Sequence, residues 1–149
     1  MNPNQPTFLR PTFGERLFNR LFGLFVGLGL GLRHNYLLQV SGRRTGRLYS
    51  TPVNILDYEG RRFLVAPRGE TQWVRNARSS GQIWLKKGRV RQSYRVREIG
   101  DAEKPMLLKT YLDRFTTTVQ RYFPVPAGSP PAGFSELTSH YPVFELLPQ

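Results

Sequence analysis

The chain has 149 residues, enough for one domain with a hydrophobic core, and its 22 basic against 10 acidic side chains give a formal net charge of +12. This charge favours an anionic partner, and it is concentrated in residues 61–97, where Glu70 is the sole acid. The absence of cysteine excludes disulfides and thiolate chemistry and is typical of the reducing cytoplasm. With two isolated histidines, His34 and His140, we expect no metal site.

The first expected element is a helix over residues 13–32, which is rich in Leu, Phe and Gly. Its uncharged part, from Leu21 to Leu32, is shorter than the roughly 20 apolar residues that span a bilayer. We predict an N-terminal apolar helix within residues 1–34, followed by a domain at residues 35–149. The helix is expected either to attach peripherally to the inner face of the cell membrane or to pack against protein.

After residue 35 the pattern changes from helical to extended. A first helix is expected at residues 70–78, and a longer amphipathic helix is expected from Asp101, a good N-cap residue, to about Tyr122. Strands are expected at residues 36–40, 49–56, 61–66, 82–86, 90–98 and 141–147. Six short strands with two inserted helices favour an α+β fold with a small antiparallel barrel or a split sheet.

The turn between the first two strands, Ser41–Arg47, has the composition of an anion-binding site. Its two glycines let the backbone turn tightly, and its three arginines and two hydroxyl groups are donors suited to phosphate or carboxylate oxygens. The ordinary alternative is a hydrated hairpin turn.

Two segments in this order resemble a known family. The first is Leu37–Arg47 followed by Ser50–Val53, and the second is Val65–Asn76. Together they are similar to the deazaflavin-dependent oxidoreductases, the nitroreductase and quinone reductase family that uses coenzyme F-420. The resemblance implies a split β-barrel of the FMN-binding type that transfers a hydride from the reduced deazaflavin. The acceptor would be a quinone, a nitroaromatic compound or another activated unsaturated molecule.

The resemblance also implies cofactor-binding residues. The turn would hold the phosphate and oligoglutamate tail of the coenzyme through Arg43, Arg44, Thr45, Gly46 and Arg47. The ring system would lie beside Thr51 and Pro52, and the wall near the ring and phosphate would consist of Ala66, Pro67, Arg68 and Gly69. The helix that braces this wall would contribute Trp73 and Asn76. No catalytic residue is assigned, and the proton would come from solvent or from Tyr49, Tyr111, Tyr122 or Tyr141.

Several alternatives stay open. FMN also carries a phosphate that suits an arginine turn, and a basic barrel with Trp84 and Tyr94 on its sheet is compatible with nucleic-acid binding. A carrier that binds the coenzyme without turnover and a homodimer are further possibilities. Arg68 stands where lysine is frequent in the family, and the compact loop from Arg68 to Trp73 leaves the acceptor open.

Overall fold

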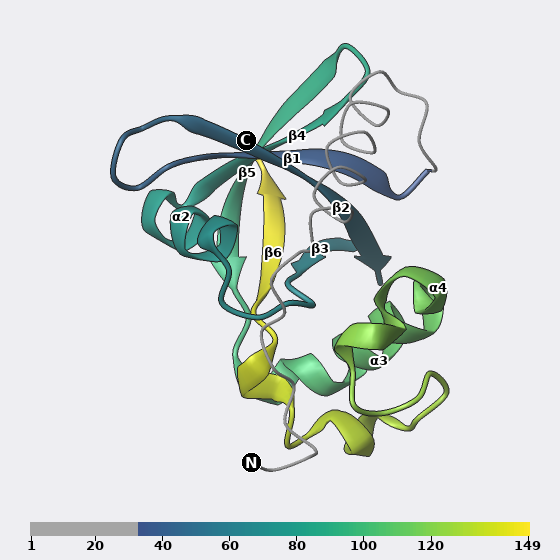
Figure 1. Cartoon of the computed structure of the whole chain (residues 1–149). Helices are drawn as coiled ribbons and strands as arrows, with labels where there is room; N and C mark the ends of the chain where they lie inside the picture. The colour runs from purple at the N-terminus through teal and green to yellow at the C-terminus, as the bar shows by residue number, and fades with distance from the viewer. Residues whose placement is uncertain (1–32) are drawn as a thin grey trace.

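The computed structural model describes residues 33–149, so the helix predicted at residues 13–32 lies outside it. Six antiparallel strands close into a barrel in the order β1-β2-β3-β6-β5-β4 (Figure 1). They are β1 (Asn35–Ser41), β2 (Leu48–Tyr58), β3 (Arg61–Val65), β4 (Gln82–Lys87), β5 (Val90–Glu98) and β6 (Val143–Pro148). Each strand lies within one or two residues of its predicted position, and the predicted α+β barrel is confirmed.

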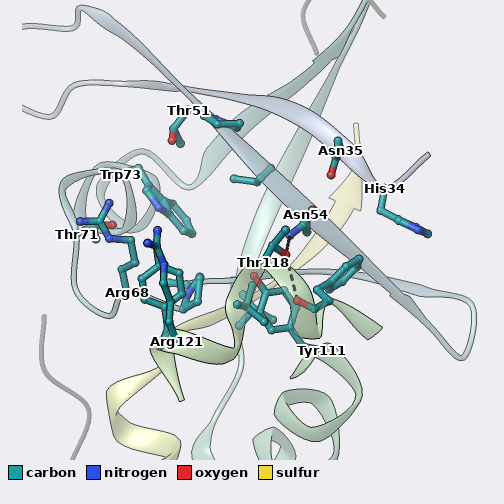
Figure 2. Close-up of a pocket in the computed structure, with 18 of the residues that line it drawn as sticks. His34, Asn35, Thr51, Asn54, Arg68, Thr71, Trp73, Tyr111, Thr118 and Arg121 are labelled. Atoms are coloured by element: carbon teal, nitrogen blue, oxygen red, sulfur yellow. Dashed lines mark hydrogen bonds between the residues drawn. The ribbon is translucent and has the colours of Figure 1, made fainter. Parts of the chain in front are cut away.

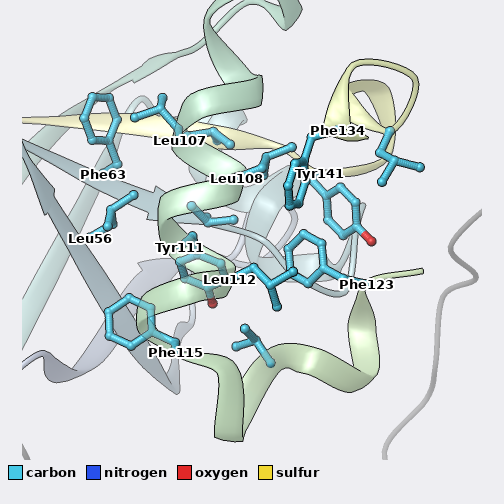
Figure 3. Packing of buried hydrophobic residues seen from close by; sticks show 14 of the residues in the cluster. Leu56, Phe63, Leu107, Leu108, Tyr111, Leu112, Phe115, Phe123, Phe134 and Tyr141 are labelled. Carbon is cyan, nitrogen blue, oxygen red and sulfur yellow. The ribbon is translucent and has the colours of Figure 1, made fainter. Parts of the chain in front are cut away.

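The central strands are buried on both faces because their side chains alternate between two cores. Along β3, Leu64 points into the barrel interior, whereas Phe63 and Val65 belong to a second core outside it. Figure 3 shows this outer core, in which the aromatic and leucine side chains of the C-terminal helices pack against Phe63 and Leu56 of the sheet. The outer core therefore fixes the helices against one side of the barrel.

The helices are inserted at two points of the barrel. Helix α2 (Gln72–Ser80) connects β3 to β4. A 3₁₀ turn η1 (Asp101–Glu103), α3 (Lys104–Arg114), α4 (Thr116–Val119) and η2 (Gln120–Tyr122) follow β5, and the turns η3 (Pro131–Phe134) and η4 (Thr138–His140) lead back into β6. Figure 1 shows α2 on one flank of the barrel and α3 and α4 on the other side.

The prediction of one continuous helix from Asp101 to Tyr122 was wrong in two details. The helix breaks at Phe115, which has φ −114° and ψ 30°. The break precedes three consecutive threonines, and the Thr116 hydroxyl donates to the Leu112 carbonyl at 2.8 Å. Threonine is stiff and competes for backbone partners, which explains why the regular helix ends here. Asp101 also does not cap the helix and instead pairs with Lys104, 2.9 Å away.

Candidate functional site

An open cleft of about 1020 Å³ lies between the barrel and the α3–η2 segment (Figure 2). Its lining comes from β2, from the loop that joins β3 to α2, and from α3, α4 and η2. Small-molecule sites usually measure about 300 to 1000 Å³. The cleft therefore has room for an extended cofactor and a small second molecule.

The cleft is lined by cationic side chains. Arg68, Arg114 and Arg121 belong to its lining, and within residues 33–149 no aspartate or glutamate does. The Arg114 guanidinium donates to the Asp57 carbonyl at 2.7 Å, and that of Arg121 donates to the Tyr122 hydroxyl at 2.5 Å. This charge distribution favours an anionic ligand.

One wall of the cleft is built from the end of β3 and the start of α2. We call Ala66, Pro67, Arg68, Thr71 and Trp73 the β3–α2 wall. The Ala66 backbone N–H donates to the Pro142 carbonyl at 2.9 Å, and the Trp73 ring packs at 6.2 Å from the Phe144 ring. These contacts attach the wall to the segment that enters β6, so its position is set by the barrel.

Thr71 contributes an unusual polar atom to this wall. It is the N-cap residue of α2, yet its side chain makes no capping hydrogen bond. Its hydroxyl oxygen is buried and has no hydrogen-bond partner among the described residues. Buried polar atoms are normally satisfied, so an orphaned hydroxyl in a cleft wall is consistent with a bound polar ligand.

The structure brings together part of the predicted binding set. The members that line the cleft are Thr51, Pro52, Ala66, Pro67, Arg68 and Trp73. The members outside its lining are Arg43, Arg44, Thr45, Gly46, Arg47, Gly69 and Asn76. The second group lies on the β1–β2 turn, in the loop before α2 and within α2.

The β1–β2 turn is attached to α2 through Arg43. The Arg43 guanidinium donates to the side chains of Gln72 at 3.0 Å and Asn76 at 2.8 Å, and its backbone N–H also donates to Asn76 at 3.1 Å. Gly42 lets the Tyr49 ring pack against the turn, because a Cβ atom at this position would lie 2.8 Å from that ring. The turn thus adjoins the cleft through Gln72, which belongs to the lining.

The sequence did not identify a polar cluster at the other end of the cleft. Asn54 of β2 donates to the Thr118 hydroxyl at 3.3 Å and also hydrogen-bonds the Tyr111 phenol. Figure 2 shows Asn54, Thr118 and Tyr111 together near the centre of the view, between Thr51, Thr71, Arg68 and Trp73 on the left and His34 on the right. We call Asn54, Tyr111 and Thr118 the Asn54 cluster.

The four tyrosines considered as proton donors differ in position. Tyr49, Tyr111 and Tyr122 line the cleft, whereas Tyr141 is buried outside it and donates to the Tyr122 carbonyl at 2.5 Å. Burial raises the pKa of Tyr111, and its hydrogen bond with Asn54 opposes this only in part. Tyr111 is therefore a neutral phenol at physiological pH.

Two basic side chains of β5 form hydrogen bonds with other strands of the barrel. Arg97 donates to Glu145 at 2.7 Å, and Arg91 donates to Gln39 at 2.7 Å while its guanidinium covers the Trp84 ring at 4.4 Å. Trp84 is thus already covered on one face by an internal cation. This arrangement weakens the alternative of a nucleic-acid-binding sheet, which would need Trp84 open for base stacking.

Comparison with known proteins adds to this geometry. The model of the family "F-420H(2)-dependent quinone reductase" matches residues 16–123, which is more than half of the chain. A search of the curated proteins gives no match.

Three solved structures are similar in fold. A protein of unknown function from Agrobacterium tumefaciens (Atu2129) has 18% identity and a TM-score of 0.57 over 96% of this chain, which spans 58% of that protein. A structure described as a domain-swapped dimer has 16% identity and a TM-score of 0.54, with 89% and 92% of the two chains covered. A reductase dependent on reduced F-420 (FDR-A) has 16% identity and a TM-score of 0.50, with 76% and 94% covered.

Proposed function

The chain belongs to the F-420H(2)-dependent quinone reductase family, and on that premise we propose that its cleft binds coenzyme F-420 along the β3–α2 wall. The family match confirms the resemblance, and with it the prediction of an oxidoreductase that uses this coenzyme. One observation supports this placement. The second segment that resembles the family lines a cleft that contains three arginines and, among the described residues, no aspartate or glutamate.

The residues present fit the coenzyme. Its phosphate and glutamate tail are anionic, and Arg68 in the wall with Arg44 and Arg47 on the turn are guanidinium groups suited to such oxygens. Ala66, Pro67 and Trp73 give the wall an apolar surface for a planar ring. The orphaned Thr71 hydroxyl supplies a hydrogen-bonding partner at the same wall.

The protein needs no nucleophile for this reaction. When bound, the reduced coenzyme supplies the hydride. The β3–α2 wall would orient the ring and exclude water from one of its faces, because its backbone and Trp73 are fixed against β6. Arg43 acts as a positioning residue in this scheme, since its hydrogen bonds attach the turn to α2.

The acceptor would enter the remaining part of the cleft, beside α3, α4 and η2. A quinone or a nitroaromatic compound is planar and apolar, and this part is lined by Phe115, Val119 and Tyr122. The two molecules would then lie side by side within one cleft, as direct hydride transfer requires.

A fluorescence titration of the purified protein with oxidised F-420, FMN and an oligonucleotide tests the cofactor. We expect saturable binding of F-420, with weaker binding of the other two ligands. Reduction of a quinone by the loaded protein separates a reductase from a coenzyme carrier. Tight FMN binding without an F-420 response would overturn the proposal.

Thr71→Val tests the placement within the cleft. The valine keeps the shape and removes a hydroxyl that has no partner among the described residues, so the fold should be unaffected. Loss of one hydrogen bond, about 1 kcal/mol, should weaken F-420 binding about fivefold. Thr110→Val is the matched control, because Thr110 lies on α3 outside the cleft lining. Equal affinities of the two variants would contradict the placement.

Two further aspects concern assembly and location. We propose a homodimer, and support comes from the structural neighbour described as a domain-swapped dimer. Within residues 33–149, no helix is long and apolar enough to cross a membrane. A cytoplasmic location with peripheral contact through residues 13–32 remains our proposal from the sequence.

A further inference from the structure

The Asn54 cluster is a polar group at the end of the cleft away from the β3–α2 wall (Figure 2). Its three members come from three elements, β2, α3 and α4, so the cluster forms only when the helices dock on the barrel. The Tyr111 ring is buried at 2% exposure, which fixes its phenol against the sheet. The cofactor placement proposed above makes no use of these side chains.

The hydrogen bonds within the cluster leave one donor hydrogen over. The Thr118 hydroxyl accepts from Asn54 and donates to the Phe115 carbonyl at 3.1 Å. Asn54 lowers the pKa of the Tyr111 phenol, as a donor to the phenol oxygen does, so the second amide hydrogen of Asn54 serves Tyr111. The phenol hydrogen is then the one that remains. The described residues provide no acceptor for that hydrogen.

The elements that carry the cluster also place apolar side chains in the cleft. Val53, Phe115 and Val119 belong to its lining, and the Phe115 ring is flanked edge to face by His34 at 5.3 Å. Arg114, a cation of the same lining, donates to the Asp57 carbonyl at 2.7 Å. A single donor hydrogen in an apolar environment is suited to one carbonyl oxygen on a planar aromatic molecule. A ligand carboxylate would have one hydrogen-bond donor at the Asn54 cluster, whereas the arginines of the cleft provide several donors.

We propose that the Asn54 cluster is the acceptor subsite, which binds a neutral quinone with one carbonyl oxygen on the donor hydrogen and its ring against Phe115. This inference rests on the proposed function, because it assumes that the coenzyme occupies the opposite wall. The cluster thereby selects acceptors that carry an oxygen on the side of the ring that faces Tyr111.

The same hydrogen bond assists reduction. The quinone gains two electrons and one hydrogen as the hydride from the reduced coenzyme, which becomes oxidised, and negative charge develops on the carbonyl oxygen. A donor held in place by Asn54 and the outer core stabilises that charge without reorganisation. The proton that completes the hydroquinone comes from solvent, and the cluster keeps its own hydrogen. The raised pKa of Tyr111 is consistent with a phenol that stays protonated.

Binding of 1,4-naphthoquinone to the protein without coenzyme tests the subsite directly. Naphthalene, which has the same shape without the oxygens, is the reference ligand, and both dissociation constants are measured by ligand-observed NMR. We expect the wild type to prefer the quinone. Asn54→Leu and Tyr111→Phe should each reduce that preference, and the larger loss, about fivefold for one hydrogen bond, should appear in Tyr111→Phe, which removes the donor itself.

Tyr141→Phe is the matched control for Tyr111→Phe. Both substitutions remove a phenol hydroxyl from the outer core, but Tyr141 does not line the cleft. The control should keep the quinone preference, and all variants should bind F-420 within twofold of the wild type. With the loaded enzyme, kcat/KM for the quinone should fall in both cluster variants and not in the control.

The possible failures are distinguishable. An unchanged quinone preference in folded Tyr111→Phe would overturn the subsite, whatever the coenzyme does. A wild-type protein that binds the quinone through Tyr111 but fails to bind F-420 would refute the proposed function and, with it, the assignment of the bound quinone as the hydride acceptor.

Discussion

At the scale of single residues, the two neighbouring arginines of the β1–β2 turn have different roles. Arg43 is held by Gln72 and Asn76, whereas Arg44 is exposed and forms no hydrogen bond or ion pair with the described residues. The sequence presents the two as equivalent ligands for the coenzyme tail. The structure favours Arg44 for contact with the anion and Arg43 for positioning the turn.

Replacing Arg44 with alanine tests this division. Loss of an exposed ion pair is worth about 0.5 to 1 kcal/mol, so F-420 binding should weaken two- to fivefold and the effect should shrink as salt is raised. The free energy of unfolding should change by less than about 0.5 kcal/mol. Arg89→Ala, at the β4–β5 turn, is a control of equal charge. Identical F-420 titrations for the two variants would argue against tail binding by this turn.

The lining of the cleft shows which residues were accessible to sequence reasoning. Thr51, Pro52, Ala66, Pro67, Arg68 and Trp73 were predicted because each sits within one of the two short segments that resemble the family. Thr71 and Gln72 lie in the second segment but were not predicted. Asn54 and Thr118 carry no local signal. Tyr111 was named only as one of four possible proton donors, since a tyrosine on an amphipathic helix indicates core packing equally well. Their meeting depends on how α3 and α4 dock, which no short stretch of sequence encodes.

At the scale of elements, the strands were predictable because turn residues separate short apolar runs, as at Glu59–Gly60 between β2 and β3. The break of the last helix at Phe115 was not, because the apolar spacing continues through it. An ion-pair group across the barrel was also beyond local reasoning, because Arg97 of β5 joins Arg61 of β3 around Glu145 of β6. This carboxylate connects three adjacent strands.

Glu145 makes the stability of the barrel dependent on pH. Hydrogen bonds from Arg61, with a further contribution from Arg97, lower the pKa of Glu145 to about 2. A lowered pKa in the folded state stabilises the fold above the ordinary pKa of 4.5, and this contribution is lost as the pH falls from about 4.5 towards 2. Glu145→Gln should therefore lower the free energy of unfolding by about 1 to 3 kcal/mol at pH 7.

Urea denaturation of the wild type and Glu145→Gln at pH 7 and pH 3 measures this effect. The difference between the two proteins should be smaller at pH 3. Glu136→Gln is the control, because Glu136 is exposed and pairs with no cation in the described part of the chain. A difference that stays constant between the two pH values would show that the ion pairs do not contribute as stated.

At the scale of the whole molecule, β3 is the wall shared by two cores, with the barrel interior on one side and the helical layer on the other. The cleft opens between the barrel and that layer, so its two ends belong to different parts of the fold. The β3–α2 wall is attached to the barrel alone, whereas the Asn54 cluster forms between the barrel and the helical layer. Cofactor binding should thus be less sensitive than acceptor binding to mutations in the outer core.

The apolar segment at residues 13–32 belongs to this scale too, because it would place the whole domain at a membrane surface. Phe25→Glu introduces a charge into its uncharged stretch and removes an apolar side chain worth about 1.5 to 3 kcal/mol when buried. Co-sedimentation with vesicles of anionic phospholipid should fall about tenfold or more. Met106→Glu places the same charge at an exposed apolar position of α3 and should bind as the wild type does. If both variants sediment like the wild type, the segment packs on protein and the peripheral location is refuted.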